Sequence, residues 1–117
     1  MPQHYAGTTG VTLTLVWFAD AAANDVKWQA AFRAVPDDAE DVDTTAHSYT
    51  YNHSGGVTVP SAIGEAGYDD ITFTDGADMD SVAAGISFIL RIKRDPADPL
   101  DNMTSDASLW QIHVKET

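Results

Sequence analysis

The chain has 117 residues, a formal net charge of −12 and no cysteine. This length suits one domain with its own core, and the lack of cysteine excludes disulfides, zinc–thiolate sites and thiol nucleophiles. The strong acidity argues against nucleic acid and anionic membrane surfaces as partners. No apolar run approaches the ~20 residues of a membrane span, and the first residues do not read as a signal peptide.

The acidity is mostly aspartate, because Asp outnumbers Glu by 15 to 3 and there are only 3 Lys. Short carboxylates with few lysines make a strongly hydrated surface whose self-repulsion salt can screen. At molar salt the screening length is only about 3 Å. The composition therefore favours a high-salt or marine source, with an ordinary acidic exterior as the alternative.

The first half of the chain predicts strands at residues 11–18, 26–33 and 46–52, because apolar and polar residues alternate there. Tyr49 and Tyr51 share one face of the third strand. The residues expected to face the core in the first two strands are Val11, Leu13, Leu15, Trp17, Val26, Trp28, Ala30 and Phe32. Residues 54–56 are expected to break the chain.

The second half predicts strands at residues 57–59, 71–73, 86–93 and 107–115, with one or two helical turns within residues 78–85. The inward side chains are expected to be Ile86, Phe88, Leu90 and Ile92 in the longer central strand, and Trp110, Ile112 and Val114 in the last. About seven strands separated by turn residues predict an all-β fold, an antiparallel β-sandwich of the jelly-roll type. Residues 1–10 are expected to form an N-terminal arm and residues 11–117 a single jelly-roll domain.

Asp95, Asp98 and Asp101 are weak candidates for a metal site, because calcium binds loop carboxylates and carbonyls. They lack the spacing of an EF-hand, and in such an acidic chain clusters of Asp arise from composition alone. The alternative is that these residues accept backbone N–H bonds in turns. The sequence thus predicts no cofactor, with calcium as the alternative.

His47, Tyr49, Tyr51 and His53 would lie on one face of a single strand, and they are the candidate ligand-binding residues. Aromatic rings stack on sugar faces while histidine supplies polar contacts, so one interpretation is a carbohydrate-binding stripe. The other is that the two tyrosines face the core, with the histidines at the strand ends.

Motifs for catalysis are missing from the sequence. There is no Gly-x-Ser-x-Gly elbow and no phosphate-binding glycine loop. The sequence therefore predicts a protein that is not an enzyme and has no catalytic residues; a small hydrolase using Glu65 and the Asp clusters is the remote alternative.

A resemblance covers the chain from about residue 10 to 115. The run from Ile89 through Arg94-Asp95, Asp98 and Asp101, followed by Ala-Ser-Leu-Trp and an alternating strand at 107–114, resembles the closing strand pair of a jelly-roll module in structural proteins of tailed viruses. The strands at 11–18 and 26–32 are similar to earlier strands of that module. It resembles modules of phage and archaeal-virus particles that serve as capsid decoration, turret or fibre-head proteins.

The resemblance implies a non-enzymatic virion structural protein on the particle surface, outside the cell, forming a homotrimer and contacting other virion proteins such as the major capsid protein. A carbohydrate-binding or host-receptor-binding module, with host surface glycans as partners, is the alternative function. Arg94-Asp95 also has a purely structural interpretation. The prolines at 96 and 99 stop strand pairing, and Arg94 can bridge loop carboxylates bidentately, so the run can simply make a corner.

Overall fold

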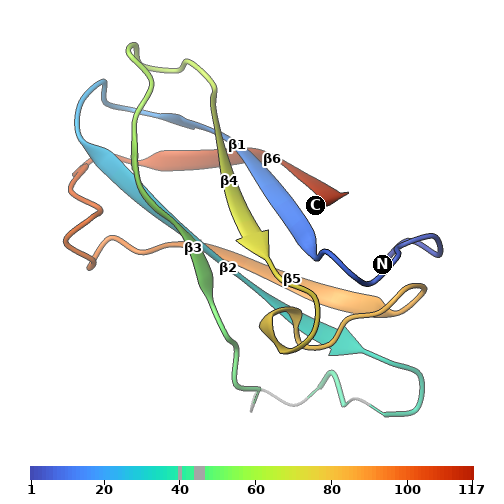
Figure 1. The fold of residues 1–117 in the computed structure, drawn as a ribbon. Coiled ribbons are helices and arrows are strands. Elements are labelled where there is room, and N and C mark those ends of the chain that lie inside the picture. Colours follow the sequence, from blue (N-terminus) through green and yellow to red (C-terminus); the bar gives the residue numbers. More distant parts are fainter. Residues whose placement is uncertain (40, 44–46) are drawn as a thin grey trace.

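The computed structural model describes residues 1–39, 41–43 and 47–117 (Figure 1). The elements are strands and one short 3-10 helix. In chain order they are β1 (Val11–Ala19), β2 (Asp25–Val35), β3 (Asn52–Thr58), β4 (Gly67–Phe73), η1 (Ala77–Met79), β5 (Ser87–Arg94) and β6 (Ala107–Glu116).

The strands form two antiparallel sheets of three strands each, in the orders β4-β1-β6 and β3-β2-β5. Figure 1 shows the two sheets as layers facing each other. Every connection changes sheet except the one between β2 and β3. The predicted all-β antiparallel sandwich is confirmed at this level.

The core lies between the two central strands, as the alternation predicts. Leu13 of β1 pairs with Ile71 of β4 on one side and with Val114 of β6 on the other. Across the layers, Phe32 meets Phe73 edge to face, with ring centroids 4.9 Å apart. All eight residues predicted to face the core from β1 and β2 are buried, namely Val11, Leu13, Leu15, Trp17, Val26, Trp28, Ala30 and Phe32.

The third predicted strand is wrong over most of its length. Residues 47–51 have no regular structure, and Ala46 lies outside the described residues. The strand β3 begins at Asn52 and runs through the glycines that were expected to break the chain. These glycines are tolerated because the β2–β3 register shifts between Lys27 and Gln29, and Gly55 takes a positive φ of 75° in this irregularity.

The inward direction predicted for Trp110 is also wrong. In β6, Leu109 pairs with Trp17 and Gln111 pairs with Val16, so Trp110 is the extra residue of a β-bulge. A strict alternation read from the sequence has no way to include this extra residue. Trp110 is 66% exposed.

The helical turns predicted within residues 78–85 reduce to the 3-10 turn η1. Asp80 ends η1 in the left-handed conformation and begins no helix. The described residues contain six strands, where about seven were expected, because the single strand β3 stands in place of the two predicted at 46–52 and 57–59.

The first ten residues lie against the sandwich near the start of β5. The Met1 amino group donates to the carbonyl of Ile86 at 2.7 Å, and the Gly85 N–H donates back to the carbonyl of Met1 at 2.9 Å. Tyr5 is buried in the core cluster, and its hydroxyl donates to Asp75 at 2.8 Å. Burial and this carboxylate raise the pKa of Tyr5 to about 12.

Candidate functional site

Arg94 organises the corner that connects β5 to β6. Its guanidinium donates two hydrogen bonds to Asp101, from Nε to Oδ2 at 2.8 Å and from Nη2 to Oδ1 at 2.7 Å. It also donates to the carbonyls of Ser105, at 2.7 Å, and of Met103. A bidentate pair of this kind fixes position as well as charge, so Arg94 holds the second half of the loop to the end of β5.

Asp101 connects the same corner to β2. Its side chain is fully buried, and its Oδ2 accepts the backbone N–H of Lys27 at 2.9 Å. Burial raises the energy of the charged carboxylate, but the bonds from Arg94 and Lys27 outweigh that cost, and the pKa of Asp101 is lowered. The charged form therefore belongs to the folded corner.

The other two carboxylates of the run have separate partners. Asp98 accepts from Lys27 Nζ at 2.7 Å and from the Leu100 N–H at 2.9 Å, and these bonds lower its pKa. Asp95 accepts from Gln29 Nε2 at 3.1 Å. The three side chains predicted as weak metal candidates thus bind arginine, lysine and glutamine groups of their own chain.

In the described ranges, no group of three or more His, Asp and Glu side chains is arranged to hold a metal ion. Asp101 and Asp98 are each neutralised by a cation 2.7 Å away. The structural interpretation of Arg94-Asp95 as a corner accounts for these contacts. Calcium binding stays a prediction without support from the geometry.

Of the four candidate ligand-binding residues, Tyr49 and Tyr51 lie on the outer surface of β5. The Arg91 guanidinium carbon lies 4.4 Å from the ring centre of Tyr49, and Lys93 Nζ lies 4.4 Å from that of Tyr51. Arg91 also donates to the Tyr51 hydroxyl at 3.3 Å. These cation–π contacts hold the segment before β3 on the sheet. The tyrosines are half-buried, but they pack on cations and not in the core between the sheets.

The two candidate histidines, His47 and His53, make different contacts. The ring of His47 lies edge-on to Tyr49 at 4.7 Å, and its Nε2 lies 3.7 Å from Asp80. His53 is exposed in β3, where its Nδ1 accepts the Gly55 N–H at 3.3 Å. The structure therefore gathers His47, Tyr49 and Tyr51 along one line and places His53 in a different local contact. One face of each tyrosine ring is occupied by a cation, which leaves less of it for a sugar. Ligand binding here stays a prediction.

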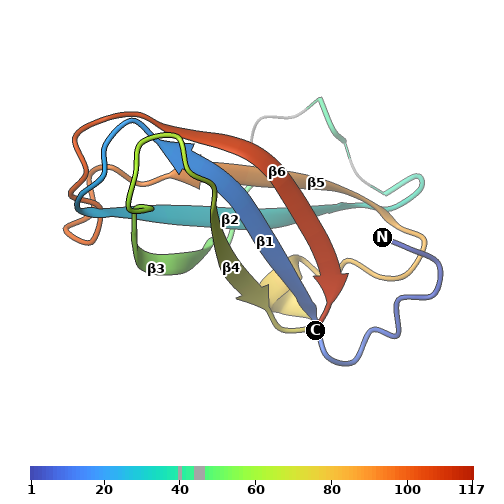
Figure 2. The same ribbon diagram turned by 90° about the horizontal axis from the view of Figure 1, so that it is seen from above.

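The two long sides of the sandwich differ in how they close. Figure 2 shows β3 and β4 along one side and β5 and β6 along the other. On the β3–β4 side, Asn52 Nδ2 donates across the layers to the Thr72 carbonyl and to Asp78, both at 2.9 Å. Trp17 Nε1 donates to Asp69 of β4 at 2.7 Å. The bonds of Asn52 therefore join the two sheets on this side, while the Trp17–Asp69 bond ties β4 to β1 within one sheet.

The β5–β6 side is open. Ile112 and Val114 pair with the core residues Leu15 and Leu13 of β1, yet they are 39% and 42% exposed. The inward side chains of β5 are only partly buried against the core, and these are Phe88, Leu90 and Ile92. Each of the two strands pairs with one neighbour only. The inward direction predicted for Ile112 and Val114 holds, but the burial expected with it is missing.

Charge is distributed unevenly between these sides. All six basic residues come from β2, β5 and β6: Lys27, Arg33, Arg91, Lys93, Arg94 and Lys115. The strands β3 and β4 carry no basic residue, and β4 carries Asp69 and Asp70. Sequence reasoning missed this segregation, although five of the six basic residues lie in three predicted strands, and the sixth, Arg94, directly follows one of them.

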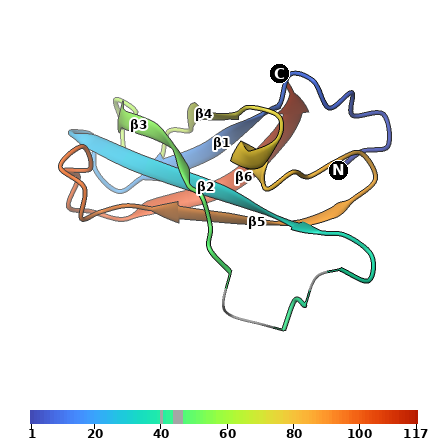
Figure 3. The same ribbon diagram turned by 60° about the horizontal axis from the view of Figure 1, so that its bottom comes forward.

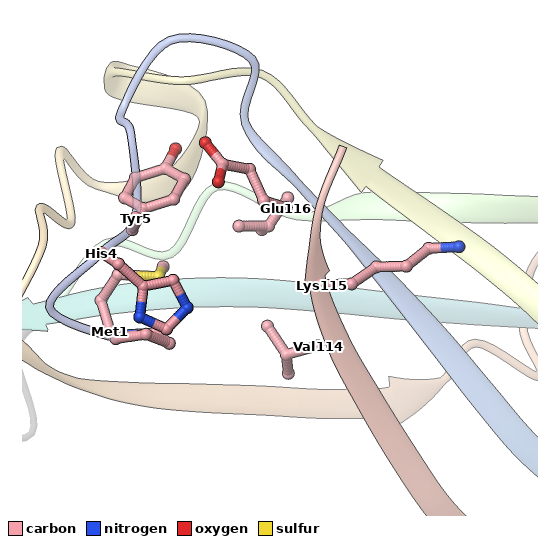
Figure 4. Close-up of a pocket in the computed structure, with 8 residues that line it drawn as sticks. Met1, His4, Tyr5, Val114, Lys115 and Glu116 are labelled. Atoms are coloured by element: carbon pink, nitrogen blue, oxygen red, sulfur yellow. The ribbon is translucent and has the colours of Figure 1, made fainter.

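A hollow of about 170 Å³ lies where the N-terminal residues meet the end of β6. Figure 4 shows Met1, His4 and Tyr5 on one side of it and the β6 side chains Val114, Lys115 and Glu116 on the other. Figure 3 shows the N-terminus near the connection that leads into β5. Because Val114 is one of the exposed inward residues, this hollow continues the open β5–β6 side.

Comparison with protein-family models, with curated proteins and with solved structures gives no match. The described part of the chain contains no helix long and apolar enough to cross a membrane.

Proposed function

We propose that this chain is a non-enzymatic structural subunit of a tailed-virus particle, exposed on a capsid, turret or fibre head, that assembles as a homotrimer. Its contacts in the particle would be with its own copies and with neighbouring virion proteins such as the major capsid protein. A salty or marine environment for the particle belongs to the same proposal and rests on the Asp-rich charge of −12.

The observation that carries the proposal is the open β5–β6 side. Apolar side chains that belong between two sheets are exposed there along two unpaired strand edges. Soluble proteins cover or blunt such edges, because an exposed edge pairs with other chains. In an assembly a neighbouring chain can cover an edge of this kind, whereas in an isolated domain the edge stays exposed to water.

The connectivity supports the jelly-roll part of the proposal. Jelly rolls have eight strands in two sheets. The six strands here change sheet at each connection except β2–β3, as the last six strands of a jelly roll do. In that arrangement, the positions of the two further strands lie beside β6 and β5, which are the two edges left open here.

The resemblance in sequence supports the virion part. Its most specific element is the Arg-Asp…Asp…Asp run, and Arg94, Asp98 and Asp101 of that run form the bonded corner between β5 and β6. The corner itself is a feature of fold, so the assignment to a virus particle depends on the combination of this motif with the open side.

The mass of the protein in solution tests the assembly. We expect sedimentation equilibrium in 2 M NaCl, at tens of micromolar protein, to give three times the chain mass of 12.6 kDa. High salt is chosen because it screens the repulsion between copies that each carry −12. A single species of 12.6 kDa at the highest concentration would contradict the proposal.

Immunogold labelling tests the location. Antibodies raised against the chain are applied to virus particles purified from the culture that expresses its gene. We expect gold on the outside of intact particles, with an antiserum against an unrelated cellular protein as the control. Protein found only in the particle-free fraction would reject a virion subunit.

A further inference from the structure

We propose that the open β5–β6 side of one copy packs on the acidic β3–β4 side of a second copy, head to tail. This inference rests on the proposed self-assembly and names the two surfaces that would meet.

The first argument is the geometry of the strand edges. β6 and β5 are edge strands on one side of the molecule, and β4 and β3 are edge strands of the same two sheets on the other side. If the second copy adds its β4 beside β6 and its β3 beside β5, both sheets continue across the contact. Added strands would also cover Ile112 and Val114, which a flat surface reaches poorly because they point between the layers.

The second argument is charge complementarity. Arg91, Lys93 and Lys115 are exposed on β5 and β6, where the only acidic residue is Glu116. The facing surface offers Asp70, exposed on β4, and Glu65, exposed in the loop before it, while the half-buried Asp69 is bonded to Trp17; β3 and β4 carry no basic residue. A contact between like sides would place cations against cations or carboxylates against carboxylates. Head-to-tail packing places opposite charges together and limits the repulsion between two strongly acidic chains.

The third argument is symmetry. A contact between two different surfaces of identical chains is heterologous, so each copy keeps one free surface of each kind after the first contact forms. Such a contact either closes into a ring or grows into a filament. Closure after three copies gives the proposed trimer.

Two variants break one surface each. Trp110→Glu places a carboxylate on the exposed bulge of β6, and Glu65→Lys with Asp70→Lys reverses charge on the β3–β4 side. All three residues are exposed, so folding should survive, and circular dichroism checks that it does. Val42→Glu, at an exposed position in the β2–β3 connection, is the matched control. We expect each surface variant to raise the dissociation constant of the assembly at least ~10-fold and the control to change it less than ~3-fold.

Mixing the two surface variants tests whether the contact between copies is head to tail. The Trp110→Glu chain keeps an intact β3–β4 side, and the doubly substituted chain keeps an intact β5–β6 side. Head-to-tail packing therefore predicts that an equimolar mixture, unlike either variant alone, forms complexes of at least two chains. A folded mixture that stays monomeric overturns the inference.

The remaining outcomes separate the inference from the function on which it rests. A trimeric wild type whose mass is unchanged by both surface variants overturns the two named surfaces and leaves the proposed assembly intact. A wild type that is monomeric at every concentration and salt overturns both.

Discussion

The two long sides of this sandwich are built from the same kind of edge strand, yet they end differently. On the β3–β4 side, Asn52 bridges the layers through the Thr72 carbonyl and Asp78, and the inward residues Ile71 and Phe73 are buried. On the β5–β6 side, Ile112 and Val114 occupy equivalent inward positions and remain about two-fifths exposed. The difference teaches that alternation sets the direction of a side chain, while burial depends on whether the opposite sheet closes over it, as β3 does over β4.

The largest difference in stability is expected between substitutions of two tryptophans. Trp17 is fully buried and bonded to Asp69, whereas Trp110 is 66% exposed on β6. We expect Trp17→Ala to lower the free energy of unfolding by about 3–5 kcal/mol, and Trp110→Ala to lower that of the monomer by less than about 1 kcal/mol. Urea unfolding at submicromolar protein, where assembly is minimal, gives both values. Equal losses would show that the β5–β6 side is closed in solution.

The corner between β5 and β6 should carry the next largest effect. Arg94→Ala leaves the buried carboxylate of Asp101 without its cation, so we expect the free energy of unfolding to fall by about 2–4 kcal/mol. Arg91→Ala removes an exposed cation–π contact with Tyr49 and should lower the free energy of unfolding clearly less than Arg94→Ala does. Unfolding in urea compares the two arginines. A larger loss of unfolding free energy for Arg91→Ala than for Arg94→Ala would show that the corner does not fix the position of β5.

The polar bridge on the closed side predicts a smaller effect. Asn52→Ala removes the hydrogen bonds to Thr72 of β4 and to Asp78 of η1, and we expect it to lower the free energy of unfolding by about 1–2 kcal/mol. Ser48→Ala, at an exposed position before β3, is the control and should stay within about 0.5 kcal/mol of the wild type. Thermal unfolding followed by circular dichroism resolves this difference. A neutral Asn52→Ala would mean that apolar packing alone closes this side.

Acidification should change the stability least, and the direction of that change follows from the lowered pKa of Asp101. The folded-state pKa of Asp101 lies below its ordinary value of 3.8, so the unfolded chain takes up its proton first as the pH falls. The stability that Asp101 contributes is therefore complete above that value and is lost as the pH falls through the folded-state pKa. Asp101→Asn should be less stable than the wild type at pH 7, and the gap should narrow by pH 3. Urea midpoints at pH 7, 5 and 3 measure it; a gap that widens on acidification would contradict the pairing with Arg94.

Much of the fold could be predicted from the sequence because β1 and β2 alternate without interruption. Val26, Trp28, Ala30 and Phe32 repeat with period two, and all are buried. The prediction failed where pairing overrides local pattern. The β3 strand crosses Gly55-Gly56, which register irregularity accommodates, and the bulge at Trp110 is visible only when β6 is aligned with β1.

The candidate site was predicted in part. Bidentate bridging by Arg94 was foreseen from the residue types, and the structure identifies Asp101 as its partner. The role of Lys27 in binding Asp98 was not, because its position in a predicted strand carries no sign of a loop 71 residues away. The packing of Tyr49 on Arg91 was missed for the same reason, since contacts between distant segments depend on how the sheets pack.

Hydrogen exchange of the β5 and β6 backbone amides tests the central claim, that the open side is an interface between copies, most directly. The protein is labelled in deuterated 2 M NaCl at submicromolar and at high micromolar concentration, and peptides from β5, β6, β3 and β4 are compared. We predict that amides on these four edge strands become at least ~10-fold slower to exchange at the higher concentration, while those of residues 36–39 do not change. Exchange in β5 and β6 that is independent of concentration, in a sample shown to be trimeric, would contradict the account.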